Sequence, residues 1–149
     1  MLLECNYEAL NKNYKEFINV SKNFCDYFMF VVRRDVTELN TQEISNVIEL
    51  FKKFLVNTTE TDEWPGTKLI NDTATVYLFA LNDESAILLN HIAMNFDDWI
   101  HPSFPEDLCF LRTSSDEFLT TIIHERDAYF ILSEAEHHLI QNLFPDIFN

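Results

Sequence analysis

The chain contains one glycine, Gly66, among 149 residues, and this scarcity restricts both its turns and its loops. Gly66 follows Pro65, which predicts a type II turn with a positive φ angle at the glycine. The other turns have to use Asn, Asp and Ser, the residues that favour turns through their short polar side chains. Phosphate-binding loops and the nucleophile elbow both require several glycines. Nucleotide-dependent catalysis by the known glycine-rich routes is therefore excluded.

The composition is that of a globular and strongly acidic chain. Hydrophobic residues make up 47% of it, and its length is the commonest size of one domain, so we expect a single domain over residues 1–149. Ten basic and 25 acidic residues give a net charge of −15. This charge disfavours nucleic acid and anionic membranes as direct partners, because phosphate binding needs a basic surface. A basic protein is a permitted partner.

Cysteine usage and the absence of long apolar runs predict a cytoplasmic protein without a membrane anchor. Cys5, Cys25 and Cys109 are odd in number and form no CxxC motif, which argues against a disulfide framework or a zinc knuckle. No secretion signal is recognisable at the start of the sequence, and no run approaches about 18 uncharged apolar residues. We expect three buried thiols in a reducing compartment and no cofactor.

Apolar residues repeat at spacings of three and four in four segments, which predicts four amphipathic helices. The segments are 6–25, 40–55, 82–100 and 133–144. Asn40 or Thr41 is the expected N-cap of the second helix. Ser133 and Glu136 have the spacing of a capping box at the start of the last helix.

Strands are predicted between these helices. Residues 27–32 and 74–80 are rich in β-branched and aromatic residues, and 107–112, 117–124 and 128–132 are short β-type segments with loops of three or four residues between them. The last three predict an antiparallel meander, whereas the polar segment 57–62 is expected to be a loop. The predicted fold class is α+β, with a mixed or antiparallel sheet of about five strands covered by about four helices.

Three segments together resemble a known group of proteins. They are EWPGT at 63–67, PEDLCFLR at 105–112 and HERDAYF at 124–130. The pattern resembles a family of small uncharacterised proteins of Bacillus-like bacteria, some of which carry the label "stage III sporulation protein AH". The resemblance spans about residues 28–136 and implies that residues 1–26, with the first helix, are an addition packed on the domain. It implies no established activity and no catalytic residue.

The predicted binding site centres on the polar turn between the last two strands, because functional residues concentrate in loops. Trp64, as an exposed anchor, and Arg112 complete it. The six residues are His124, Glu125, Arg126, Asp127, Trp64 and Arg112. The alternative is purely structural: Asp127 caps backbone amides, Arg126 pairs with Glu106 or Asp107, and Trp64 fills the edge of the core.

Two reactive sites are weaker alternatives. If Arg112 pairs with Glu117, Cys109 lies opposite Thr120, on the face that also carries His124. The suggested Cys–His pair is then about 13 Å apart along the strand, which is too far for a hydrogen bond. A metal site is conceivable among Glu134, Glu136, His137 and His138, but adjacent histidines point in different directions on a helix. The expected result is a solvated helix face, with no metal and no catalytic residue.

Three functions are compatible with these features. The favoured hypothesis is a non-catalytic protein-interaction or regulatory domain, for example an immunity protein that neutralises a basic nuclease toxin. The second is a small-molecule-binding protein or enzyme with a pocket between sheet and helices, where His124, Tyr129 or Arg112 converge. The third is an oligomeric structural component in sporulation. The sequence does not define the oligomeric state.

Overall fold

The computed structural model describes residues 1–148 and has the α+β architecture expected from the sequence. Its main sheet has seven strands in the order β1-β9-β8-β7-β2-β6-β3, and all neighbouring pairs are antiparallel. The strand bounds are β1 Leu2–Glu4, β2 Tyr27–Arg33, β3 Leu55–Thr61, β6 Ala74–Ala80, β7 Glu106–Leu111, β8 Glu117–Ile122 and β9 Asp127–Ile131.

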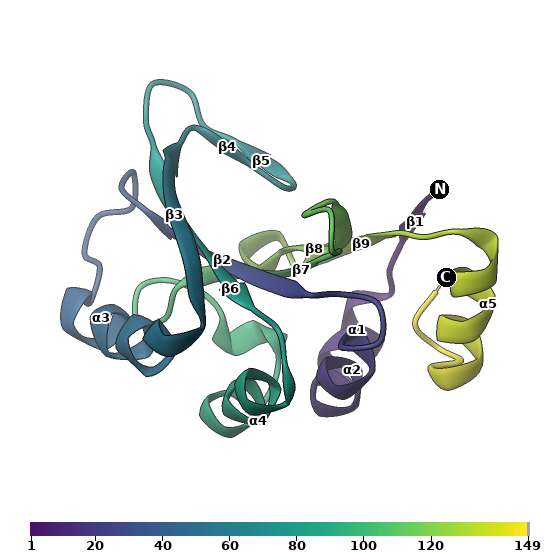
Figure 1. Cartoon of the computed structure of the whole chain (residues 1–149). Helices are drawn as coiled ribbons and strands as arrows, with labels where there is room; N and C mark the ends of the chain where they lie inside the picture. The colour runs from purple at the N-terminus through teal and green to yellow at the C-terminus, as the bar shows by residue number, and fades with distance from the viewer. Residues whose placement is uncertain (149) are drawn as a thin grey trace.

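The two faces of this sheet are covered differently (Figure 1). Five α-helices lie on one side: α1 Tyr7–Lys12, α2 Tyr14–Ser21, α3 Thr41–Leu50, α4 Asp83–Ile92 and α5 Glu134–Leu143. A small hairpin lies on the other side, with strands β4 Glu63–Trp64 and β5 Thr67–Lys68. Three short 3-10 segments complete the described elements: η1 Lys52–Phe54, η2 Phe96–Asp98 and η3 Ile123–Glu125.

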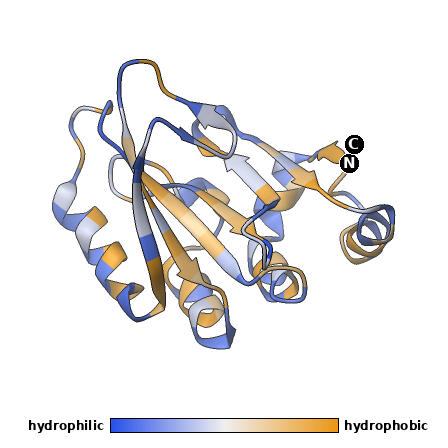
Figure 2. Ribbon diagram, turned by 45° about the horizontal axis from the view of Figure 1, so that its top comes forward, coloured by the Kyte–Doolittle hydropathy of each residue, from blue (hydrophilic) through white to orange (hydrophobic). Residues whose placement is uncertain are grey.

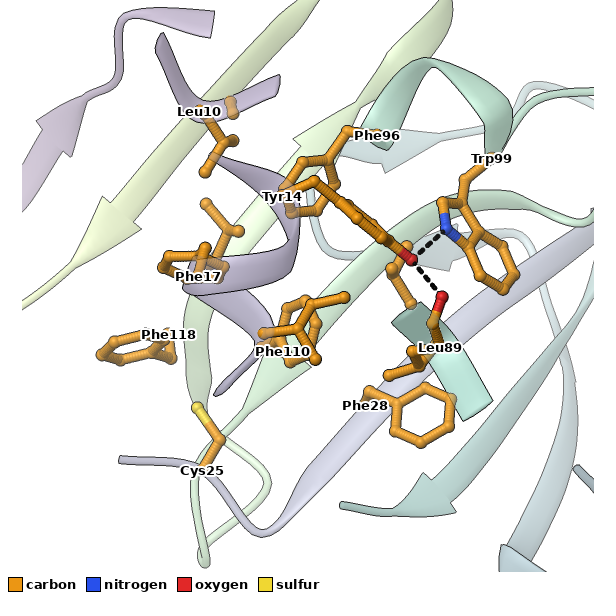
Figure 3. Close-up of a cluster of buried hydrophobic side chains, with 14 of the residues drawn as sticks. Leu10, Tyr14, Phe17, Cys25, Phe28, Leu89, Phe96, Trp99, Phe110 and Phe118 are labelled. Atoms are coloured by element: carbon orange, nitrogen blue, oxygen red, sulfur yellow. Dashed lines mark hydrogen bonds between the residues drawn. The ribbon is translucent and has the colours of Figure 1, made fainter. Parts of the chain in front are cut away.

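The main core lies between the sheet and the helices. Hydrophobic residues follow the central strands, and the helices alternate apolar and polar surfaces (Figure 2). Phe17 of α2 is fully buried, and its ring packs against the rings of Phe96, Phe110, Phe118, Phe130 and Phe144. The Tyr14 hydroxyl donates to the Leu89 carbonyl at 2.8 Å and accepts from Trp99 Nε1 at 3.0 Å, so the core leaves this polar atom satisfied (Figure 3).

Several local predictions are confirmed. The last three strands form the antiparallel meander, and Ser133 and Glu136 form the capping box of α5. The Asn40 side chain accepts from the Glu43 amide as the N-cap of α3. Gly66 has a φ of 83°, as the type II turn requires, and all three cysteines are buried and free.

The prediction of about five strands is wrong, because two further strands occupy the sheet edges. β1 has only three residues, which is too short for a periodic signal. β3 lies in the segment expected to be a polar loop; six of its seven residues are exposed and the seventh is half-buried. An edge strand with both faces open to solvent lacks the apolar alternation by which strands are recognised.

Three predicted helices are shorter than expected. The segment 40–55 ends as a helix at Leu50, and η1 and the first residue of β3 follow it. The segment 6–25 divides at Asn13, whose side-chain amide donates to the Ala9 carbonyl and so takes part in ending α1. The segment 82–100 stops at Ile92 because Ala93 is extended, with φ −137° and ψ 151°. Phe96 lies in η2 and Trp99 directly follows it, and both side chains are still fully buried.

Residues 1–26 contribute both to the sheet and to the core. β1 pairs with β9, the Asn6 amide donates to the Ile147 carbonyl at 2.7 Å, and the two ends of the described chain lie side by side (Figure 1). Whether this segment is an addition to a smaller family domain stays a prediction. None of the helices within residues 1–148 combines the length and the apolar character that crossing a membrane requires.

Candidate functional site

The sheet face opposite the helices carries the candidate site, beneath the β4–β5 hairpin. Trp64 points into a second apolar cluster and is only 5% exposed. A Cβ atom on Gly66 would lie 2.9 Å from Thr120 Cγ2 and 3.0 Å from Ile122 Cγ1. The hairpin turn therefore rests directly on β8, at a distance that only glycine allows.

Two adjacent carboxylates, Glu106 and Asp107, lie buried at the start of β7 under this hairpin. Trp64 Nε1 donates to Asp107 Oδ2 at 3.4 Å, and the Ile123 amide donates to Oδ1 at 2.9 Å. Burial raises the pKa of the Asp107 carboxyl to about 6, and the Glu106 carboxylate adds to this rise, although both hydrogen bonds oppose it. Asp107 is thus a buried acid held in one orientation.

Arg33, at the end of β2, provides the positive charge beside this pair. Its Nη1 lies 3.5 Å from Glu106 Oε2, in contact but without hydrogen-bond geometry. Its Nε and Nη2 instead donate to both carboxylate oxygens of Asp35, at 2.9 and 2.7 Å. His101 Nε2 accepts from the Arg33 amide at 3.0 Å, so its Nδ1 is the protonated nitrogen that donates to the Phe104 carbonyl. Burial lowers the pKa of His101.

His124, in η3, closes the cluster from the solvent side. One donor atom each of Glu106, Asp107 and His124 lies within 4.8 Å of the others. The two acids are buried, whereas the His124 side chain is 40% exposed. The cluster therefore combines two carboxylates and an imidazole and opens to solvent at the imidazole. Such a set of donors is able to hold a divalent cation.

An acidic groove of about 530 Å³ continues from Trp64 along the turn between β7 and β8. All of its charged lining residues are acids: Glu63, Asp116 and Glu117. The Thr120 and Tyr129 hydroxyls both donate to Glu117 Oε1, at 3.0 and 2.8 Å, and hold this carboxylate in place. Burial, followed by the neighbouring Glu117 carboxylate, raises the pKa of the Tyr129 hydroxyl to about 12, although Thr120 opposes the rise.

The structure brings together only part of the predicted binding site. Trp64 and His124 both lie next to Asp107. Trp64 donates a hydrogen bond to the Asp107 carboxylate, and a donor atom of His124 lies within 4.8 Å of it. Glu125 lies beside His124, with 3.9 Å between Oε1 and Nε2. Asp127 accepts from the Ala128 amide at 2.9 Å, as the structural alternative expected.

Arg126 and Arg112 point elsewhere. The expected pairing of Arg126 with Glu106 or Asp107 is wrong: with a φ of 53°, it pairs with Asp97 and Glu8. Arg112 makes a two-pronged contact with Glu136, at 2.7 and 2.9 Å, and also donates to the Ile131 carbonyl. Arg126 therefore links the sheet to α1 and η2, and Arg112 links it to α5.

The suggested Cys–His pair is not formed. The assumed pairing of Arg112 with Glu117 is wrong, because a bulge in β8 makes Leu111 the partner of Glu117. Phe110 still pairs with Leu119, in the register that the prediction assumed for Cys109 and Thr120. The Cys109 sulfur accepts from the Thr121 amide at 3.4 Å, and burial raises the pKa of its thiol to about 12. Cys109 is thus a buried and unreactive thiol.

Sequence reasoning missed the Glu106–Asp107–His124 cluster and looked for a metal site in α5 instead. There, Glu136 is bound by Arg112, and the rings of His137 and His138 stack with 6.0 Å between their centroids. The available signal was the pair of adjacent acids at the start of the apolar segment 108–111. Acids in such a position are often buried with a partner, but their proximity to His124 depends on the sheet topology.

Comparisons with protein-family models, with curated proteins and with solved structures find no match to this chain. The resemblance to the Bacillus-type family therefore stays a prediction. The class that the fold defines is an α+β protein with an antiparallel seven-stranded sheet, helices on one face and a hairpin on the other.

Proposed function

We propose that the protein is a non-catalytic interaction domain that binds a basic protein partner in the acidic groove beside the hairpin. The observation that carries this proposal is the composition of the groove, in which the acids Glu63, Asp116 and Glu117 lie beside the half-buried ring of Tyr129. Carboxylates pair with Lys and Arg side chains, and an accessible aromatic ring attracts the same cations. A segment rich in Lys or Arg is the occupant that fits this chemistry.

The orientation of Glu117 supports this proposal. Two hydroxyl donors fix its carboxylate before any partner arrives, which reduces the entropy lost on binding. Lys68 pairs with Glu63 at 3.5 Å, whereas Asp116 and Glu117 form no ion pair among the described residues. The charges of Asp116 and Glu117 are therefore available to a partner.

The distribution of charge over the described residues points the same way. Eight of the ten basic residues are already in ion pairs with Asp or Glu. The excess charge of the surface is consequently negative, and it attracts basic partners over long range. A narrower version of the proposal is an immunity protein that neutralises a basic nuclease toxin.

Titration with a short Arg-rich peptide tests the groove directly. The double variant Asp116→Asn/Glu117→Gln removes two charges but keeps hydrogen-bond acceptors for the Ser114 and Tyr129 hydroxyls. We expect it to weaken the peptide about tenfold, since each of two exposed ion pairs contributes up to about 1 kcal/mol. Calorimetry gives the affinities, and the indole N–H resonance of Trp64 reports binding in the groove.

A second double variant separates groove binding from general attraction to an acidic protein. Glu43→Gln/Glu134→Gln makes the same charge change at two exposed positions in α3 and α5. We expect it to change the affinity less than about twofold, because charges beyond a Debye length of about 8 Å are screened at physiological salt. Equal losses in the two double variants, or an unshifted Trp64 resonance, would overturn the proposal.

A further inference from the structure

We propose that Glu106, Asp107 and His124 form a binding site for a divalent first-row transition cation, with Zn²⁺ as the best match. The site is separate from the acidic groove, although Trp64 borders both. The inference does not rest on the proposed function, since it concerns different side chains and a different ligand.

The spacing of the three donors suits one cation. Zn²⁺ binds carboxylate oxygen and imidazole nitrogen at about 2.0–2.2 Å, so donors in a tetrahedral site lie about 3.4 Å apart. The donor atoms of Glu106, Asp107 and His124 already lie within 4.8 Å of one another. Small side-chain rotations bring them onto a shared ion, and the fourth position faces solvent beside the exposed His124.

An unpartnered buried oxygen is the second, independent observation. The Glu106 side chain is 5% exposed, and its Oε2 has no hydrogen-bond partner among the described residues. Arg33 Nη1 contacts this oxygen as an ion pair at 3.5 Å but makes no hydrogen bond to it, because the guanidinium directs its Nε and Nη2 to Asp35. Burying a carboxylate oxygen without a hydrogen bond is costly, and a bound cation removes that cost.

The local charge balance also matches a divalent cation. Three carboxylates, those of Asp35, Glu106 and Asp107, surround the single guanidinium of Arg33. Asp35 is exposed, so the excess of two negative charges falls on the buried carboxylates of Glu106 and Asp107, and buried charges are stable only when paired. A divalent cation restores neutrality.

Neighbouring hydrogen-bond donors orient the proposed ligands, as they do around known metal ions. The Ile123 amide and Trp64 Nε1 each donate to one oxygen of Asp107, which fixes its carboxylate while leaving lone pairs for a metal. η3 places His124 directly after Ile123, so the same turn that binds Asp107 also presents the imidazole. One turn of backbone therefore aligns two of the three ligands.

The donor set selects among metals. One imidazole with two carboxylates suits Zn²⁺ and, more weakly, Mn²⁺. At a given site of nitrogen and oxygen ligands, Mn²⁺ has the lowest affinity among the divalent first-row transition metals. Ca²⁺ takes six to eight oxygen ligands, and Mg²⁺ prefers an octahedral oxygen shell. The buried thiol of Cys109, with its raised pKa, is not an available ligand.

Calorimetric titration of the full chain with Zn²⁺, Mn²⁺ and Mg²⁺ tests the site, with salt near physiological ionic strength to screen general attraction to the acidic surface. We expect one equivalent of Zn²⁺ to bind, with Mn²⁺ weaker and Mg²⁺ weakest. His124→Gln and Glu106→Gln should each weaken Zn²⁺ at least tenfold, since loss of even an outer-shell group costs about 10- to 100-fold. Circular dichroism confirms that each variant is folded.

The matched control is His138→Gln, which removes an exposed imidazole from the α5 histidine pair. It should leave the Zn²⁺ affinity unchanged. Because the His124 side chain is partly exposed, His124→Gln keeps the test decisive even where Glu106→Gln unfolds the chain. The absence of saturable Zn²⁺ binding, unaltered binding by the His124→Gln variant, or loss of binding with His138→Gln would each overturn the proposal.

Discussion

Single residues in the left-handed backbone region take the place of the glycines that this sequence lacks. Besides Gly66, five of the residues within 1–148 have positive φ angles: Glu38, Asn71, Asp107, Ser115 and Arg126. Each such residue costs about 1–3 kcal/mol, and it persists only where the surroundings fix it. Asn, Asp and Ser were expected in this role, whereas Glu38 and Arg126 were not. At Asp107, this conformation forms part of the candidate site.

Gly66 and Ser115 allow a direct test of this backbone argument. Gly66→Ala should lower the free energy of unfolding by about 1–3 kcal/mol, because the new Cβ requires an unfavourable φ and meets Thr120 and Ile122. Ser115→Gly should change it by less than about 1 kcal/mol, since relief at a φ of 66° offsets the greater freedom of the unfolded chain. Urea denaturation measures both. A larger loss for Ser115→Gly than for Gly66→Ala would refute the argument.

At the scale of helices and strands, the sequence predicts those elements that bury an apolar face. β2, β6 and the meander were recognised because aromatic and β-branched residues follow one another there. β3 was not, although Val56, Thr58 and Thr59 have high β-propensity, because its side chains face solvent on both sides. The bulge opposite Phe110 and Leu111, where β8 has one residue more than β7, involves the pairing of two strands, which no local pattern encodes.

One ion pair, Arg112 with Glu136, links the end of β7 to α5. Hydrogen bonds from Arg112 hold the pKa of the Glu136 carboxyl below its usual value of 4.5, although partial burial opposes the shift. Glu136→Gln deletes the charge but still accepts from the Ser133 amide in the capping box. We expect a loss of about 1–2 kcal/mol in the free energy of unfolding at neutral pH.

The pH dependence of that loss gives the sharper test. Because the pKa of Glu136 is lower in the folded than in the unfolded state, its contribution is complete above about pH 4.5 and disappears as the pH falls through the folded value. The difference in unfolding free energy between the original chain and Glu136→Gln should therefore shrink below pH 4.5. Glu134→Gln, an exposed change in the same helical turn, should have little effect at any pH. A constant Glu136→Gln difference would contradict the assignment.

At the scale of the whole molecule, the candidate site shows what a single sequence leaves open. Trp64, Asp107 and His124 are far apart in the chain, and they meet because the β4–β5 hairpin folds over the sheet while η3 returns beside β7. The sequence indicated Trp64 and the His124 turn separately, through loop position and residue type. The buried acids between them were taken for partners of Arg126, because pairing of charges is settled by topology rather than by proximity in sequence.

Self-repulsion of the acidic surface leads to a last prediction. Eleven of the 25 acids pair with Lys or Arg, so fourteen carboxylates of the described residues have no such cation within 4.0 Å. Raising the ionic strength from about 0.01 to 0.1 M shortens the Debye length from about 30 to 10 Å. We expect the free energy of unfolding to rise on the order of 1 kcal/mol, because screening relieves more repulsion than it removes from exposed ion pairs.

Urea denaturation at several NaCl concentrations measures this effect, and the isoelectric region supplies the control. Near pH 4.5, where the net charge of the chain is close to zero, the same salt increase should have little influence on stability. A fall in stability with salt at neutral pH would mean that the ion pairs outweigh the repulsion. The unpaired acids would then be locally compensated, and the long-range attraction invoked for a basic partner would lose its basis.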